Sequence, residues 1–306
     1  DFARAHLARA NYKSADPPAA HRRVKLKCLF QAPSNCLAEM HPGGTGVGHR
    51  AAHMFAQNLA SHAKEVGCTS IELLRPAQFA TVKKHGLEIA IASNGAPGGF
   101  KKGFNNPAYR EELLKYTRET IDACAEFKVP TVIGFVGFKY TNADDPKSPV
   151  ISLDDAEKNC IEGLKQIAGH AEKNGVTVAV EHLNTRDGSH PMKGHPGYQG
   201  DDLDWLAKVV RKVASPNIKI LFDIYHVQIM HGDVIRRIGE CKDIIAHIHT
   251  AGNPGRNELD ANQEIQYQPI MKKLVEVGYK GFVGHEFIPT RNAKEGLKQA
   301  VDVCDV

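Results

Sequence analysis

The chain has 306 residues, of which 42% are hydrophobic and 24% charged, an ordinary balance for a globular protein. Its formal net charge is +4 and the basic residues are dispersed, so we expect no dedicated nucleic-acid partner. No apolar run is long enough to span a bilayer, so we expect no membrane partner either. The seven cysteines form no CxxC pair, which argues against zinc-finger and disulfide-scaffold proteins.

The beginning of the chain differs from the rest. Residues 1–23 are polar and alanine-rich and contain Pro17-Pro18, so we predict an irregular N-terminal arm. Residues 24–306 are predicted to form one domain. The cytoplasm is the default expectation for location, but the first residue is Asp1 rather than methionine, so a removed export signal stays open.

Short runs rich in β-branched residues then alternate with helix-length segments whose apolar residues recur at three-to-four spacing. The predicted strands cover residues 24–30, 70–74, 88–93, 131–137, 177–183, 218–225, 244–250 and 281–288. The clearest predicted helices cover residues 49–66, 107–127, 153–173, 201–214 and 268–277.

Residues that typically end and begin helices support these boundaries. A glycine closes a predicted helix and precedes a strand at four places, namely Gly67, Gly86, Gly175 and Gly278. Ser152 with Asp155 resembles a capping pair at the start of the helix over 153–173.

Eight strands in strict alternation with helices predict an α/β protein, a (β/α)₈ TIM barrel in a single domain with the arm in front of it. The alternative is an open doubly wound sheet, which often has a GxGxxG turn directly after its first strand. The nearest match begins at Gly46, well past the strand that ends near Phe30, so we favour the barrel.

The active site of such a barrel lies at the carboxyl ends of the strands. Strands five to eight each end with one side chain that can bind a metal, and these residues are Glu181, Asp223, His249 and Glu286. Three buried carboxylates repel one another unless a positive charge lies among them, and a divalent cation supplies that charge. Oxygen-rich ligation with one imidazole favours Mn²⁺, Mg²⁺ or Co²⁺ over structural Zn²⁺. Alternatively, each residue forms its own salt bridge to a lysine or arginine.

Other polar residues lie near the same strand ends. His226 lies three residues after Asp223 and either bonds a substrate oxygen or anchors a loop. Arg256 and Glu258 belong to the loop after strand seven, where they either contact substrate or are solvated. Strand alternation predicts that His247 lies one layer deeper than His249. His182 and His285 are predicted to face the helices.

Four segments resemble the xylose-isomerase-like barrel enzymes, a family that includes hydroxypyruvate isomerase and the ketose 3-epimerases. They are Glu181-His-Leu-Asn184, Phe222-Asp-Ile-Tyr-His-Val-Gln-Ile-Met230, His249-Thr-Ala-Gly-Asn-Pro-Gly-Arg-Asn-Glu258 and Gly284-His-Glu-Phe-Ile-Pro289. The second and third look most like hydroxypyruvate isomerase, and the resemblance runs from about Val24 to Val306.

The resemblance implies that Glu181, Asp223, His249 and Glu286 bind one metal ion. It also implies that Glu181 and Glu286 act as base and acid, and that His226 and Arg256 contact substrate oxygens. Hydroxypyruvate isomerases typically carry Gln at the position of His249, whereas the epimerases carry His.

These features predict an isomerase of a small hydroxy-keto compound that moves a proton between carbons through an enediolate. The expected partner is a small keto acid or sugar, and a homo-oligomer is possible. The alternatives are a ketose 3-epimerase, an abasic-site endonuclease and a non-catalytic sugar-binding barrel.

Overall fold

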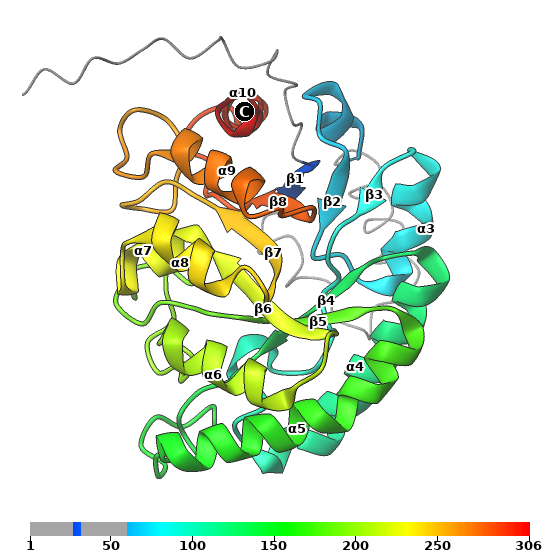
Figure 1. Ribbon diagram of the computed structural model, residues 1–306, viewed down its shortest axis with the longest axis vertical. Coiled ribbons are helices and arrows are strands. Elements are labelled where there is room, and N and C mark those ends of the chain that lie inside the picture. Colours follow the sequence, from blue (N-terminus) through cyan, green and yellow to red (C-terminus); the bar gives the residue numbers. More distant parts are fainter. Residues whose placement is uncertain (1–26, 32–59) are drawn as a thin grey trace, which may run out of the picture.

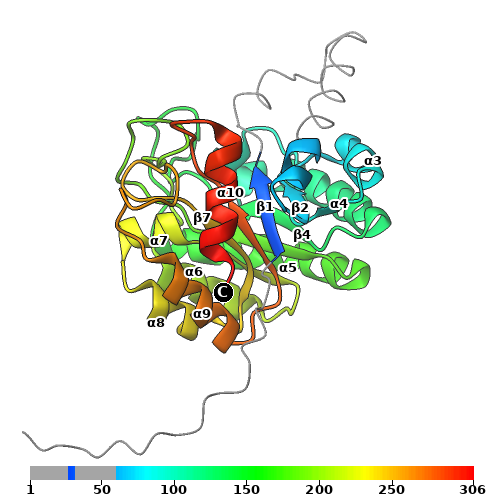
Figure 2. The same ribbon diagram turned by 90° about the horizontal axis from the view of Figure 1, so that it is seen from above.

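The computed structural model describes residues 27–31 and 60–306, and these form a parallel sheet that closes on itself (Figures 1 and 2). The strand order is β3-β2-β1-β8-β7-β6-β5-β4. The first and last strands join where Ala92, just beyond β3, pairs with Val132 of β4. Ala92 donates a backbone hydrogen bond to Thr131 (2.8 Å) and accepts one from Ile133 (2.9 Å). The predicted TIM barrel is therefore confirmed.

All eight predicted strands are present, although most are shorter than their predicted ranges. They are β1 (Lys27–Gln31), β2 (Ser70–Glu72), β3 (Glu88–Ile89), β4 (Thr131–Phe135), β5 (Thr177–Glu181), β6 (Ile218–Asp223), β7 (Ile245–Thr250) and β8 (Phe282–His285). The predicted arm over 1–23 lies outside the described residues.

Helices lie on the outside of the curved sheet (Figure 1). They are α3 (Pro76–Lys84), α4 (Arg110–Phe127), α5 (Leu153–Asn174), α6 (Leu203–Val213), α7 (Ile224–Met230), α8 (Val234–Cys241), α9 (Tyr267–Glu276) and α10 (Ala293–Cys304). Two short 3₁₀ helices, η1 (Gly99–Lys101) and η2 (Pro107–Tyr109), precede α4. Residues 60–65 are helical, and the rest of the predicted helix over 49–66 lies outside the described part. None of the described helices is long and apolar enough to cross a membrane.

The longest described helix begins and ends at the predicted residues. The Ser152 hydroxyl accepts a hydrogen bond from the Asp155 amide (3.1 Å), which caps the first turn of α5. Gly175 ends the helix with φ +64°, a left-handed conformation that glycine adopts without steric cost.

The barrel interior has its own small apolar layer, separate from the main core between sheet and helices. Its members are Ile91, Ile133, Ala179 and Leu221. Because side chains alternate along a strand, residues two positions later point to the same interior face. Glu181 follows Ala179 and Asp223 follows Leu221 in this way, so both carboxylates point into the barrel directly above the apolar layer.

Two of the shortened strands have a visible cause for their early end. The strand predicted over 218–225 ends at Asp223, since Oδ1 of Asp223 accepts hydrogen bonds from the amides of Tyr225 (2.8 Å) and His226 (3.3 Å). This capping begins α7 immediately after the strand. The strand predicted over 70–74 ends at Glu72, because Leu73 has φ +54°, outside the range of extended backbone.

Candidate metal centre

The four predicted metal ligands lie together at the carboxyl ends of four neighbouring strands. Glu181 and Asp223 end β5 and β6, His249 is the penultimate residue of β7, and Glu286 directly follows β8. Each offers a nitrogen or oxygen atom, and these atoms all lie within 4.8 Å of one another. The strand order β8-β7-β6-β5 makes the two glutamates the outer members of this four-residue cluster.

The imidazole of His249 lies among the three carboxylates. Its Nδ1 atom is 2.6 Å from Oε2 of Glu286, 3.6 Å from Oε1 of Glu181 and 4.0 Å from Oδ2 of Asp223. His249 is fully buried, and the side chain of Glu286 is 12% exposed. The fold thus brings together, in one buried site, four side chains that are spread over 105 positions of the sequence, from Glu181 to Glu286.

The carboxylates of the cluster have strongly shifted pKa values. Burial, with the nearby charges of Glu286 and Asp223, raises the pKa of Glu181 to about 7. Burial also raises the pKa of Asp223. Burial disfavours the ionised form of Glu286 as well, but Arg256 and His249 outweigh this and lower its pKa to about 2. Opposite shifts within one site are typical of functional carboxylates.

In the metal-free protein, His249 supplies positive charge among the three carboxylates. Burial lowers the pKa of its imidazole, but Glu72 and Glu286 outweigh this and hold the pKa well above its ordinary value. An imidazolium therefore lies among the carboxylates, and a cation that binds through Nδ1 would have to displace its proton.

Three atoms of the cluster are buried without a well-oriented hydrogen bond to any described residue. They are Oε1 of Glu181, Nδ1 of His249 and Oε2 of Glu286. Leaving a buried polar atom unsatisfied costs about 1–3 kcal/mol, so three in one place are unusual. The two carboxylate oxygens carry lone pairs that a cation can use, and Nδ1 of His249 offers one once its proton is displaced, so the cluster could bind a metal ion.

Arg256 lies directly against this cluster. Its Nη2 atom is 2.9 Å from Oδ2 of Asp223 and 2.6 Å from Oε2 of Glu286, and the residue is 2% exposed. Its φ of +56° is uncommon for a side chain of this size, and such strain is often found at functional sites. The alternative that Arg256 is a solvated loop residue is wrong.

His226 is buried between the cluster and the loop after β5. Its Nδ1 atom accepts a hydrogen bond from the Asn184 amide (3.2 Å). Nε2 lies 3.1 Å from Nη1 of Arg256 and 3.6 Å from Oδ2 of Asp223. Burial and the charge of Arg256 hold its pKa well below the ordinary value, which keeps the ring neutral. His226 anchors a loop with one nitrogen and faces the cluster with the other.

Glu258 is buried but points elsewhere. Its carboxylate accepts hydrogen bonds from the amide (2.9 Å) and hydroxyl (2.7 Å) of Thr290 and from the Arg291 amide (3.3 Å). These contacts anchor the segment after β8. A substrate contact of Glu258 stays a prediction.

Residues 60–305, which are most of the chain, match the family described as xylose isomerase-like TIM barrel. The chain belongs to the xylose isomerase-like TIM barrel family. The resemblance read from the strand-end motifs is confirmed.

Curated relatives of this xylose isomerase-like chain are isomerases. The 2-oxo-tetronate isomerase of Cupriavidus necator is 29% identical over 255 residues, which are 80% of this chain and 91% of that protein. The human putative hydroxypyruvate isomerase is 34% identical over 137 residues, 45% of this chain and 47% of that protein. The chain is an enzyme of the isomerase class.

Solved structures share the fold at lower identity. A family 2 AP endonuclease from Brucella melitensis has 23% identity and a TM-score of 0.69, covering 89% of this chain and 96% of its own. A D-psicose 3-epimerase determined in the presence of D-fructose has 16% identity and a TM-score of 0.65, covering 91% of this chain and 96% of its own.

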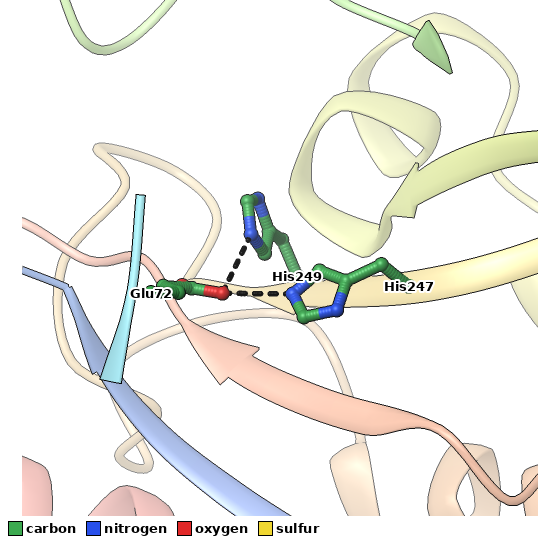
Figure 3. Close-up of side chains that lie close together, drawn as sticks. All are labelled: Glu72, His247 and His249. Atoms are coloured by element: carbon green, nitrogen blue, oxygen red, sulfur yellow. Dashed lines mark hydrogen bonds and ion pairs between the residues drawn. The ribbon is translucent and has the colours of Figure 1, made fainter. Parts of the chain in front are cut away.

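Two residues that lie near the candidate metal centre were not singled out from the sequence. Glu72, the last residue of β2, contacts both His247 and His249 (Figure 3). A lone acid inside an apolar run, between Ile71 and Leu73, was a signal in the sequence that could have indicated it.

His195 is the second unpredicted residue, and it lies in the loop after β5. Its ring packs 4.2 Å from that of Phe100 in η1, lies 6.0 Å from that of His226, and is mostly buried. Burial and the charge of Arg256 lower its pKa to about 4. No spacing in the sequence connects the loops after β3 and β5, so this contact required the structure.

His182 and His285 do not contact the four-residue cluster. Nε2 of His182 lies 2.9 Å from the Asp201 carbonyl oxygen, and Nδ1 of His285 lies 2.9 Å from the Thr250 hydroxyl. His247 lies one layer below His249, as predicted, with its Nε2 bonded to Glu72.

Proposed function

We propose that the chain is a metal-dependent isomerase that moves a proton between neighbouring carbons of a small hydroxy-keto compound. One observation carries the proposal: three carboxylates and an imidazole converge within 4.8 Å at the carboxyl ends of β5 to β8. The site lies where barrel enzymes perform their chemistry.

Glu181, Asp223, His249 and Glu286 would hold one divalent ion. Their oxygen-rich donor set suits Mn²⁺, Mg²⁺ or Co²⁺. When bound, such an ion polarises the substrate carbonyl and stabilises the negative charge that develops on its oxygen during proton transfer.

The two glutamates would also move the proton. They are the outer members of the cluster; Oε1 of Glu181 is buried without a hydrogen bond, and Oε2 of Glu286 forms ion pairs with His249 and Arg256. A carboxylate removes the weakly acidic proton next to the carbonyl, and the same or the facing carboxylate returns it at the neighbouring carbon. Asp223 cannot share this task easily, because its Oδ1 is used by the amides that begin α7.

The substrate oxygens would be bound by Arg256, in the loop after β7, and by His226, in the first turn of α7. A guanidinium donates hydrogen bonds suited to carboxylate oxygens, and a neutral imidazole can donate to or accept from a hydroxyl group. Hydroxypyruvate and 2-oxo-tetronate, the compounds named for the curated relatives, are therefore the first substrates to test.

A second candidate is 3-epimerisation of a free ketose. His249 favours it, since the epimerases resemble this chain at that position. Both reactions begin with removal of the same kind of proton, and they differ only in where the proton returns. Product stereochemistry on one panel of compounds separates them.

The experiment that tests the proposal follows exchange of substrate C–H for deuterium in heavy water. The panel holds 2-oxo acids and ketoses, with and without added Mn²⁺, Mg²⁺ or Co²⁺. We expect metal-dependent exchange with at least one compound. Absence of exchange across the panel, in a protein shown to bind metal, would contradict isomerase and epimerase readings alike. Tight sugar binding without exchange would support the non-catalytic barrel, and metal well above one ion per chain would support the endonuclease.

A further inference from the structure

Glu72 lies at the bottom of the candidate metal centre. It is fully buried, and its Oε2 atom is 2.7 Å from Nε2 of His247 and 3.2 Å from Nε2 of His249. Figure 3 shows both imidazoles directed at the same carboxylate oxygen. One acid thus contacts both interior histidines of β7.

The contact between Glu72 and His249 reaches across the barrel. Two strands, β1 and β8, separate β2 from β7 in the sheet, so the two side chains meet in the interior rather than along a strand pair. The residue of β8 that pairs with His249 is Gly284. A Cβ atom at Gly284 would lie 2.6 Å from both carboxylate oxygens of Glu72 and 2.8 Å from Cδ2 of His249. The contact therefore requires glycine at this position.

When a bound cation has displaced the Nδ1 proton of the imidazolium, the hydrogen bond to Glu72 determines which nitrogen of His249 keeps its hydrogen. An ionised carboxylate only accepts hydrogen bonds, so Nε2 of His249 must carry the hydrogen that it donates to Glu72. In the neutral ring the other nitrogen, Nδ1, is then unprotonated. That atom is the one that lies 2.6 Å from Glu286 and 3.6 Å from Glu181.

We propose that Glu72 is the positioning residue of the metal centre: it holds His249 in the Nε2–H tautomer, with Nδ1 directed at Glu181, Asp223 and Glu286. This inference rests on the proposed function. Acids that bond the remote nitrogen of a metal-binding imidazole raise metal affinity by about 10–100-fold, because they fix ring orientation and basicity. His247 acts below it, since its own Nε2–H bonds the same oxygen and keeps Glu72 in place.

The competing interpretation is that Glu72, His247 and His249 are themselves ligands of a separate ion, since their atoms also lie within 4.8 Å of one another. That site and the four-residue cluster would share His249. A neutral imidazole has one lone pair for coordination, so the ring cannot serve both sites without losing its remaining proton. The charges also favour the upper cluster, which gathers three carboxylates against one.

The experiment measures Mn²⁺ affinity from the electron paramagnetic resonance signal of the unbound ion. Glu72→Gln keeps the shape of the side chain and removes its charge. The matched control is Glu157→Gln, which removes a carboxylate that pairs with Lys208 and Lys212 far from the barrel interior. We expect Glu72→Gln to weaken Mn²⁺ binding by about 10–100-fold and the control to leave it unchanged.

Gly284→Ala provides a second test that alters neither Glu72 nor any proposed ligand. The added methyl group must displace the Glu72 carboxylate or the His249 ring, so Mn²⁺ affinity should fall as in Glu72→Gln. Its control is Gly169→Ala, on an exposed position of α5 where an added Cβ meets nothing within 4 Å. If Glu72→Gln does not fold, this glycine pair decides the question.

A spectroscopic measurement reads the tautomer directly. In ¹⁵N-histidine-labelled protein loaded with Mg²⁺, the His249 ring, identified by its loss in His249→Gln, should show a proton on Nε2 that exchanges slowly with solvent. In Glu72→Gln this proton should exchange faster or disappear while the backbone amides of β7 keep the exchange rates of the parent, whereas a general loss of stability would speed both.

The outcomes separate this inference from the proposed function. Affinity of Glu72→Gln and Gly284→Ala within twofold of the parent overturns the inference and leaves the function standing. Two bound ions in the parent, of which Glu72→Gln loses one, also overturn it and indicate the separate site. A parent protein that binds no Mn²⁺ overturns the proposed function and this inference with it.

Discussion

Nη2 of Arg256 lies 2.9 Å from Oδ2 of Asp223, and both side chains are buried. The same nitrogen contacts Glu286, so one guanidinium offsets part of the charge of two carboxylates. Its Nε atom donates to the Glu286 carbonyl oxygen (3.1 Å), which fixes the loop after β7 to the end of β8. Arg256 therefore has a structural role in the protein before any substrate binds.

Replacing this arginine should destabilise the metal-free protein. Removing one partner of a buried ion pair leaves the other charge uncompensated, which costs about 3–5 kcal/mol. We expect Arg256→Met to lower the thermal unfolding midpoint by many degrees, and added Mn²⁺ to recover more stability in the variant than in the parent. Calorimetry with and without Mn²⁺ measures both. A midpoint equal to that of the parent would show that the pair contributes nothing.

Ionisation of Glu181 should cost stability in the metal-free protein. The pKa of this group is raised from 4.5 to about 7, so the folded state holds the proton more tightly than the unfolded state. Stability from this group is complete below pH 4.5 and is lost as the pH rises through 7. The Glu181→Gln variant has no such ionisation, so its advantage over the parent should grow across this window, to on the order of 3 kcal/mol at pH 8.

The measurement is chemical denaturation of both proteins at pH 4.5 and pH 8 in the presence of a chelator. Glu157→Gln is the matched control, because this carboxylate pairs with Lys208 and Lys212 away from the cluster and its pKa is shifted in the opposite direction. An advantage of Glu181→Gln that is equal at the two pH values would contradict the pKa shift.

Neutralising either outer glutamate should abolish most of the proton transfer. A positioned acid or base contributes about 10²–10⁴-fold to the rate. We therefore expect Glu181→Gln and Glu286→Gln each to lower kcat for deuterium exchange by about this factor. Thermal midpoints and metal content, measured on the same samples, separate lost chemistry from lost folding. If either variant retains exchange within threefold of the parent, that glutamate is not a proton-transfer group.

Most of the candidate metal centre could be predicted from the sequence, because the end of a strand is a local feature of the sequence. Hydrophobic runs stop at Glu181, Asp223 and His249, and a barrel places successive strand ends at the same level. The end of β6 was misplaced by two residues, since nothing in an apolar pattern shows that Asp223 caps a helix. The contact from Glu72 to His249 could not be predicted, because it joins two strands that two others separate and because it requires a residue without a side chain at Gly284.

The most direct test of the central claim is a titration of metal-free protein with Mn²⁺ while deuterium exchange is followed in an active 2-oxo acid or ketose. If the four-residue cluster holds the ion that supports proton transfer, the exchange rate should rise in proportion to added Mn²⁺ and reach its plateau at one ion per chain. Asp223→Asn should reach that plateau only at much higher Mn²⁺. Exchange that is already maximal without metal, or that keeps rising well beyond one ion per chain, would contradict the account.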